Sequence, residues 1–350
     1  MMFSSSLRST LTLLVVAALS VSATPTLSLK VSGPQSVNDV GRLRVVATLV
    51  NTGDETLKLL NDPRGALSTL PTDTFTITDV SGSTPAFTGV KVKYVPQVAA
   101  SSNDKKAFTV LAPGQSIAVT HNLATAYNFT RTGEGSYNFE ADNLFHYIDN
   151  QNNIVPIYAD AAAYTARISG RLAVVEPTLF KRARFVGCSS DQQSKLDEAA
   201  KVAQTFAAES LAFLEDKKDG SSRYTTWFGT HTSSRRDTVL GHFKKISNNT
   251  LAEYTFDCTC KDANTYAYVY PNNFGYVTLC GAFWKAPLEG TDSRAGTIIH
   301  ESSHFTKNGG TDDHVYGQTK CKDLAIRNPK QAVNNADSHE YFAENNPSLS

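Results

Sequence analysis

The pattern of the chain changes near residue 180, and no other feature constrains the fold as strongly. From about residue 25 to 177, short runs of β-branched and aromatic residues alternate with Gly, Pro, Asn and Asp. From residue 188 onward, apolar residues recur at the three- and four-residue spacing of amphipathic helices, and all five cysteines lie there. The 350 residues therefore predict two domains of different secondary structure.

The first half has the pattern of an all-β domain. Its apolar runs are separated by turn residues at short intervals, which is the spacing typical of an antiparallel β-sandwich. We expect its strands within residues 42–51, 74–80, 90–96, 106–123 and 135–143.

The second half combines helices with short strands. Leu196, Ala199, Ala203 and Phe206 repeat at helical spacing in the longest of the predicted helices. We expect an α+β domain with helices at 189–216, 235–246, 294–306 and 335–345, and short strands at 266–271 and 276–281.

The first 23 residues have the features of a secretory signal peptide. Arg8 precedes an apolar run, and the small residues at 21–23 form a cleavage site. The run is too short for a membrane span, and no later segment reaches the roughly 18 apolar residues that a span needs. The formal net charge of +0 gives no basis for a nucleic-acid partner. We expect a secreted, extracellular monomer without a membrane or nucleic-acid partner.

Lys181 and Arg182 form a dibasic pair between the two halves, in an extended segment that follows Pro177. Processing proteases of the secretory pathway cut after such pairs. Cleavage there would separate a β-sandwich propeptide, residues 24–182, from a mature domain, residues 183–350.

The cysteines and two sequons add covalent features that suit a secreted protein. Because five is an odd number, at most two disulfides form and one thiol is left over. The spacing alone does not determine the pairing. Asn128 in "NFT" and Asn248 in "NNT" are candidate glycosylation sites.

The motif "HESSH" at residues 300–304 predicts a metal site. On a helix, residues four apart lie on one face, so His300 and His304 can bind one cation. Glu301 lies beside the cation without binding it, and it can accept a proton from water. A helix surface that merely carries two histidines is the competing interpretation, and the apolar "GTII" before the motif disfavours it.

Spacing alone does not identify the third metal ligand. Lys307 and Gly310 stand where the metzincin pattern requires Gly and His, so that class is excluded. Asp323 and Glu340 fit a more distant carboxylate ligand only loosely. The nearby turn-rich segment offers Asp312, Asp313 and His314.

"HESSH" followed by "GTDDHVYG" resembles the aspzincin metallopeptidases, the family of deuterolysin and the peptidyl-Lys metalloendopeptidases. The resemblance implies a zincin-like fold with one Zn²⁺ per catalytic domain. It implies that Asp313 is the third zinc ligand and that Tyr316 hydrogen-bonds the oxyanion of the tetrahedral intermediate. A phenol suits this task because it donates a hydrogen bond without being a base at neutral pH. A packed loop aromatic is the alternative for Tyr316.

The resemblance extends over residues 184–350 and is strongest with the peptidyl-Lys branch. It implies the disulfides Cys188–Cys258 and Cys260–Cys280. Cys321 departs from that branch, and a small buried side chain is its expected role.

Asp337 and Glu340 lie three residues apart, on one face of the last predicted helix. The resemblance implies that they bind the substrate lysine on the C-terminal side of the cleaved bond. On spacing alone, the same pair is also a capping-box-like helix start.

The predicted function is therefore a secreted zinc endopeptidase that acts on proteins or peptides and cuts before lysine. One alternative is a deuterolysin-like enzyme of broader specificity, and another is an inactive peptidase-like binding protein. The propeptide is expected to act as an intramolecular inhibitor or chaperone. Since the first half has no cysteine, a thiolate cannot block the zinc, and the choice between an occluded cleft and a ligand such as His146 stays open.

Overall fold

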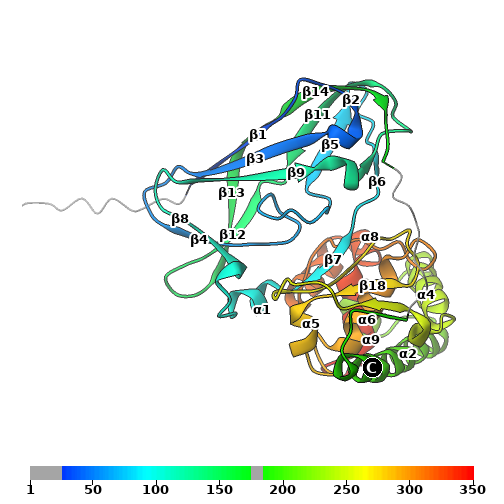
Figure 1. Ribbon diagram of the computed structural model, residues 1–350. Helices are drawn as coiled ribbons and strands as arrows, with labels where there is room; N and C mark the ends of the chain where they lie inside the picture. Colours follow the sequence, from blue (N-terminus) through cyan, green and yellow to red (C-terminus); the bar gives the residue numbers. More distant parts are fainter. Residues whose placement is uncertain (1–25, 175–183) are drawn as a thin grey trace, which may run out of the picture.

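The computed structural model describes residues 26–174 and 184–350. The signal peptide at 1–23 and the dibasic pair at 181–182 lie outside these ranges. Figure 1 shows a β-rich body built from the first half and a helical body built from the second. No helix within the described ranges is both long and apolar enough to cross a membrane.

Two sheets form the β-rich body. The larger sheet contains, in spatial order, β8 (Phe108–Leu111), β4 (Leu57–Leu60), β12 (Leu144–Ile148), β13 (Ile154–Ala162), β1 (Leu27–Ser32), β3 (Arg44–Asn51) and β9 (Ser116–Asn122). The smaller sheet contains β2 (Ser36–Asp39), β14 (Tyr164–Arg171), β11 (Gly135–Ala141) and β5 (Phe75–Asp79), and a separate pair joins β6 (Ala86–Phe87) to β10 (Tyr127–Asn128). The short 3₁₀ turns are η1 (Val40–Arg42), η2 (Lys105–Ala107) and η3 (Leu123–Thr125).

One apolar core fills the space between the two sheets. Leu29, Val45 and Leu49 come from the larger sheet, and Ile77 and Phe139 come from the smaller one. The burial alternates along β3 and β11, as expected where one face of a sheet meets the core and the other meets water. Most neighbouring strands are antiparallel, whereas β1 with β13 and β2 with β14 are parallel pairs.

The second half is an α+β body. Its helices are α2 (Ser190–Asp216), α3 (Ser222–Phe228), α4 (Ser233–Ser247), α5 (Gly281–Lys285), α6 (Arg294–His304), α7 (Gln318–Arg327), α8 (Pro329–Ala332) and α9 (Ala336–Glu344), with the 3₁₀ turn η4 (Leu251–Glu253). Its sheet runs β15 (Phe185–Val186), β16 (Thr255–Asp257), β18 (Tyr276–Leu279) and β17 (Thr265–Val269). The predicted helices at 189–216, 235–246, 294–306 and 335–345 therefore form with small shifts at their ends.

The strand β7 (Lys91–Tyr94) lies apart from the sandwich, to which its place in the first half of the chain assigned it. It pairs antiparallel with β17 and so becomes the edge strand of the sheet in the second half. Figure 1 shows β7, in cyan, reaching from the β-rich body into the helical one, and α1 (Pro96–Ala100) follows it. The alternation of apolar residues predicts a strand, but it carries no information about which sheet the strand joins.

Candidate metal and substrate site

The helix α6 carries the "HESSH" motif in the centre of the second body. Ser293 caps the helix, because its side chain accepts a hydrogen bond from Gly296 N at 2.9 Å. Glu344, at the end of α9, accepts hydrogen bonds from both the backbone N and the hydroxyl of Ser293 at 2.8 Å. A Cβ on Gly296 would lie 2.1 Å from Glu344 Oε1, so only glycine allows α9 to pack this closely against α6.

Three candidate ligand atoms converge at the C-terminal end of α6. His300 Nε2 lies 3.1 Å and His304 Nε2 lies 3.4 Å from Asp313 Oδ1. Both imidazoles are fully buried, and the Asp313 side chain is almost fully buried. The structure thus brings together the three residues for which the resemblance implies zinc binding.

The environment of these atoms fits a metal ion. Among residues 26–174 and 184–350, none of the three ligand atoms has a hydrogen-bond partner of acceptable geometry. Buried polar atoms without partners are costly, and a cation bound to all three would remove that cost. Two imidazoles and one carboxylate are also a donor set that zinc commonly takes in catalytic sites.

Contacts on the far side of each ring orient the two histidines. His304 Nδ1 lies 2.8 Å from the carbonyl oxygen of Thr311. His300 Nδ1 lies 2.8 Å from Asp337 Oδ1 and 3.2 Å from Glu340 Oε2. A carbonyl or carboxylate at Nδ1 holds the proton there and leaves Nε2 free to bind a metal.

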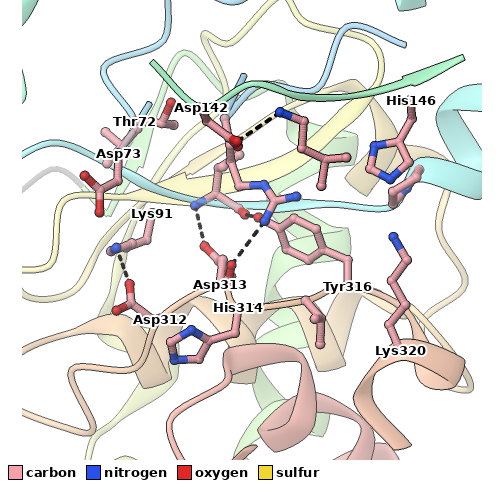
Figure 2. Close-up of a pocket in the computed structure, with 16 residues that line it drawn as sticks. Thr72, Asp73, Lys91, Asp142, His146, Asp312, Asp313, His314, Tyr316 and Lys320 are labelled. Atoms are coloured by element: carbon pink, nitrogen blue, oxygen red, sulfur yellow. Dashed lines mark hydrogen bonds and ion pairs between the residues drawn. The ribbon is translucent and has the colours of Figure 1, made fainter. Parts of the chain in front are cut away.

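Asp312 and His314, the other two candidates for third ligand, take different positions from Asp313. The Asp312 carboxylate forms an ion pair with Lys91 of β7, while its backbone pairs with the start of α9. His314 N donates to Asn335 Oδ1 at 3.0 Å. Figure 2 shows the neighbouring side chains of Asp312 and Asp313, with Asp312 next to Lys91. Turn composition alone could not separate these residues, because their roles depend on how the loop lies against α9 and β7.

Glu301 is fully buried beside the three ligand candidates. Neither of its carboxylate oxygens has a hydrogen-bond partner within the described residues. Burial raises the pKa of Glu301 to about 8. A dication bound by the adjacent histidine would lower this pKa again, since it favours the ionised carboxylate.

The Tyr316 hydroxyl is buried and lies at the same site. It donates a hydrogen bond to the carbonyl oxygen of Val92 in β7. Burial, together with the nearby Asp313 carboxylate, raises the pKa of Tyr316 well above its ordinary value. The phenol therefore stays protonated and available as a hydrogen-bond donor.

Asp337 and Glu340 form a buried acidic pocket on α9. Both side chains are fully buried, and between them lies the ammonium of Lys93, 2.6 Å from Glu340 Oε2 and 3.6 Å from Asp337 Oδ1. Burial lowers the pKa of Lys93, but the carboxylates outweigh this effect, and its net pKa is well above normal. The capping-box interpretation is wrong, because Asn335 is the N-cap and Asp337 accepts a hydrogen bond from Gly317 N at 2.8 Å.

Three further residues complete the acidic pocket, and the motif analysis missed all of them. Asp292 Oδ1 lies 3.2 Å from Lys93 Nζ. The rings of Tyr266 and Tyr341 have their centroids 5.2 Å and 5.8 Å from the same nitrogen. An ammonium is attracted to aromatic faces at this range, so the pocket offers it both charge and aromatic surface. Tyr341 follows Glu340 on α9, whereas Asp292 and Tyr266 come from separate segments that no local motif marks.

The covalent features of the second half agree with the resemblance. The structure forms disulfides between Cys188 and Cys258 and between Cys260 and Cys280. Cys321 is a buried free cysteine on α7.

The two candidate glycosylation sites differ in exposure: Asn248 is exposed at the end of α4, and Asn128 is half-buried in β10.

Comparison with known proteins places the chain in a family. A family profile described as "Lysine-specific metallo-endopeptidase", of the aspzincin type, matches residues 213–344. The chain is also 59% identical over 340 residues to the "Peptidyl-Lys metalloendopeptidase" of Grifola frondosa, and the match covers 96% of this chain and 98% of the relative. This chain is an aspzincin metallopeptidase. An aspzincin is a zinc metalloendopeptidase, so zinc is its cofactor and proteins or peptides are its substrates, and an inactive binding protein is not supported.

Two further relatives match most or all of the chain, and one solved structure matches about half of it. The "Peptidyl-Lys metalloendopeptidase" of Armillaria mellea is 51% identical over 352 residues, which cover 100% of both chains. The "Extracellular protease" of Aeromonas hydrophila is 35% identical, with 89% of this chain and 90% of the relative covered. A solved structure described as a zinc peptidase from Grifola frondosa shares 59% identity, with a TM-score of 0.46, and covers 47% of this chain and 100% of that chain.

Proposed function

We propose that this aspzincin is a secreted endopeptidase that hydrolyses peptide bonds on the N-terminal side of lysine. The observation that carries the proposal is the position of the acidic pocket. Asp337 and Glu340 lie on one side of the His300 ring, and the candidate zinc ligands lie on the other. The pocket accommodates a lysine ammonium, as its contacts with Lys93 demonstrate. A substrate lysine bound there would have its backbone close to the catalytic groups.

We assign the catalytic roles as follows. His300, His304 and Asp313 would hold zinc, which when bound would act as a Lewis acid toward the scissile carbonyl and would make water more acidic. Glu301 accepts the proton of the water whose oxygen adds to the carbonyl carbon. Tyr316 donates a hydrogen bond to the carbonyl oxygen as negative charge develops on it. When the C–N bond breaks, Glu301 returns the proton to the amine of the departing lysine.

We further propose that the enzyme matures in the secretory pathway. A signal peptide at 1–23 is removed, a propeptide at 24–182 is released after Lys181–Arg182, and residues 183–350 act as a monomer. Asn128 and Asn248 carry glycans. N-terminal sequencing of the active secreted form should give a start near Arg184, and an active chain that still begins near Thr24 would contradict the propeptide.

A cut-site map tests the specificity. A denatured protein is digested with the processed enzyme, and the new termini are identified by mass spectrometry. We expect lysine at the first position after most cuts, with little cleavage before arginine, because a planar guanidinium does not suit a pocket built around an ammonium. Cuts spread over many residue types would favour the deuterolysin-like alternative of broader specificity.

A further inference from the structure

We propose that strand β7 is an internal substrate mimic, with Lys93 filling the lysine pocket and keeping the uncleaved chain from binding other substrates. This inference rests on the proposed lysine specificity and adds the regulation of that site. Nothing in the catalytic roles assigned above requires a lysine from the first half of the chain in the pocket.

The backbone of β7 lies where a bound peptide would add a strand to the edge of the sheet. Without β7, β17 would be the edge of the sheet in the second half, with unpaired backbone groups. β7 pairs with it antiparallel, placing Lys93 opposite Ala267 and Val92 opposite Tyr268. Extended peptides commonly bind proteins in this way, through main-chain hydrogen bonds and pockets for alternate side chains.

The contacts of Val92 identify the bond that β7 presents. Val92 N donates to Asp313 Oδ2 at 3.1 Å, and Val92 O accepts the hydrogen bond from Tyr316. The carbonyl at the proposed oxyanion donor therefore belongs to the Val92–Lys93 bond. Lys93 stands on the C-terminal side of this bond, where the proposed specificity requires lysine.

Burial and charge partners distinguish Lys93 from Lys91, the other lysine of β7. Lys93 is fully buried, and three carboxylates surround its ammonium. Lys91 instead forms an ion pair with Asp312, whose side chain is 42% exposed. A buried ammonium is costly unless it is paired. Of the two lysines of β7, only Lys93 is paired with the carboxylates of the acidic pocket.

Other residues of the first half cover the rest of the site. The Arg64 guanidinium lies 4.2 Å from the ring centroid of Tyr316 and donates to the Asp313 carbonyl at 3.1 Å. The cavity beside Tyr316, of about 540 Å³, is lined from both halves, by residues that include Arg64 and His146 (Figure 2). His146 thus lines the neighbouring cavity, while Lys93 occupies the pocket itself.

Peptide binding to the full chain tests the inference. The chain carries Glu301→Gln, so that it binds peptides without cutting them, and it is loaded with zinc. Fluorescence anisotropy measures the Kd for a labelled peptide that contains one lysine, and for the same peptide with norleucine. Lys93→Ala is the test variant, and Lys91→Ala, on the same strand, is the matched control.

Lys93→Ala should tighten binding of the lysine peptide at least about tenfold, since an apparent Kd rises as the open fraction of the site falls. Lys91→Ala should leave Kd close to that of the unsubstituted strand. Equal lysine-peptide affinity with and without Lys93, or an equal gain from Lys91→Ala, would overturn the inference.

The norleucine peptide distinguishes failure of the inference about Lys93 from failure of the proposed lysine specificity. If Lys93→Ala exposes a site that binds both peptides equally, the lysine specificity itself is wrong. Far-UV circular dichroism and zinc content check folding. If Lys93→Ala does not fold, Lys93→Gln, which keeps hydrogen-bond donors for the carboxylates, enters the same comparison with the same expected outcome.

Discussion

Glu340→Gln in the processed enzyme should lower kcat/KM for lysine peptides far more than for neutral peptides, because Asp337 remains as the closer contact of His300 Nδ1. Glu340 Oε2 lies 2.6 Å from the Lys93 ammonium, and both side chains are fully buried. Removing one partner of such a pair typically costs about 2–5 kcal/mol. Because Asp337 and Asp292 remain near the ammonium, we expect the lower end of this range. About 2 kcal/mol corresponds to a roughly 30-fold loss in kcat/KM for lysine peptides.

The assay compares kcat/KM for two peptides that differ only by lysine or norleucine after the scissile bond. The ratio of the two values is independent of how much of the variant is folded, so a loss of stability cannot imitate the effect. Asp337→Asn is an informative contrast: Asp337 Oδ1 lies closer to His300 Nδ1 than Glu340 Oε2 does, at 2.8 Å against 3.2 Å, and Asp337 also accepts a hydrogen bond from Gly317 N. Its replacement should therefore lower kcat/KM for both peptides. An equal loss on both peptides for Glu340→Gln would refute the role of Glu340 in selecting lysine.

Four further substitutions test the catalytic assignment. Glu301→Gln should keep zinc, measured by elemental analysis, and lose about 10²–10⁴-fold in kcat, because the proton acceptor is gone and the ligands remain. Asp313→Ala should lose zinc and Asp312→Ala should keep it; the reverse metal contents would show that the third ligand is misassigned. Tyr316→Phe should lower kcat about 10²–10³-fold with little change in KM. A change confined to KM would assign Tyr316 to substrate binding instead.

The sequence predicted the elements of the site better than their surroundings. The helices of "HESSH" and of Asp337 with Glu340 could be located because apolar residues repeat along them at helical spacing, and both form as α6 and α9. The order of Asp312, Asp313 and His314 in a turn-rich loop could not reveal which side chain faces the histidines. That choice depends on the backbone pairing of the loop with the start of α9, a contact between segments more than twenty residues apart.

The strand at residues 91–94 shows the limit of pattern reading most clearly. Its alternation correctly predicts extended structure, and its place in the chain suggested a sandwich strand. The stabilising partners are β17 and the carboxylates of α9, which lie far away in the sequence. Asp292 could not be found for the same reason, since it contributes to the pocket from a turn that has no motif of its own.

The imidazole of His300 is shared between the two halves of the site. One ring nitrogen faces the candidate zinc ligands, and the other faces the carboxylates that receive the ammonium. Two cations bound on opposite sides of one ring repel each other, and both are stabilised by the negative charge of the same site. Occupancy of the pocket and affinity for the metal are therefore thermodynamically linked, and each must weaken the other by the same factor. A chelator should consequently remove the metal more readily from an enzyme saturated with a lysine ligand than from one whose pocket holds a neutral side chain.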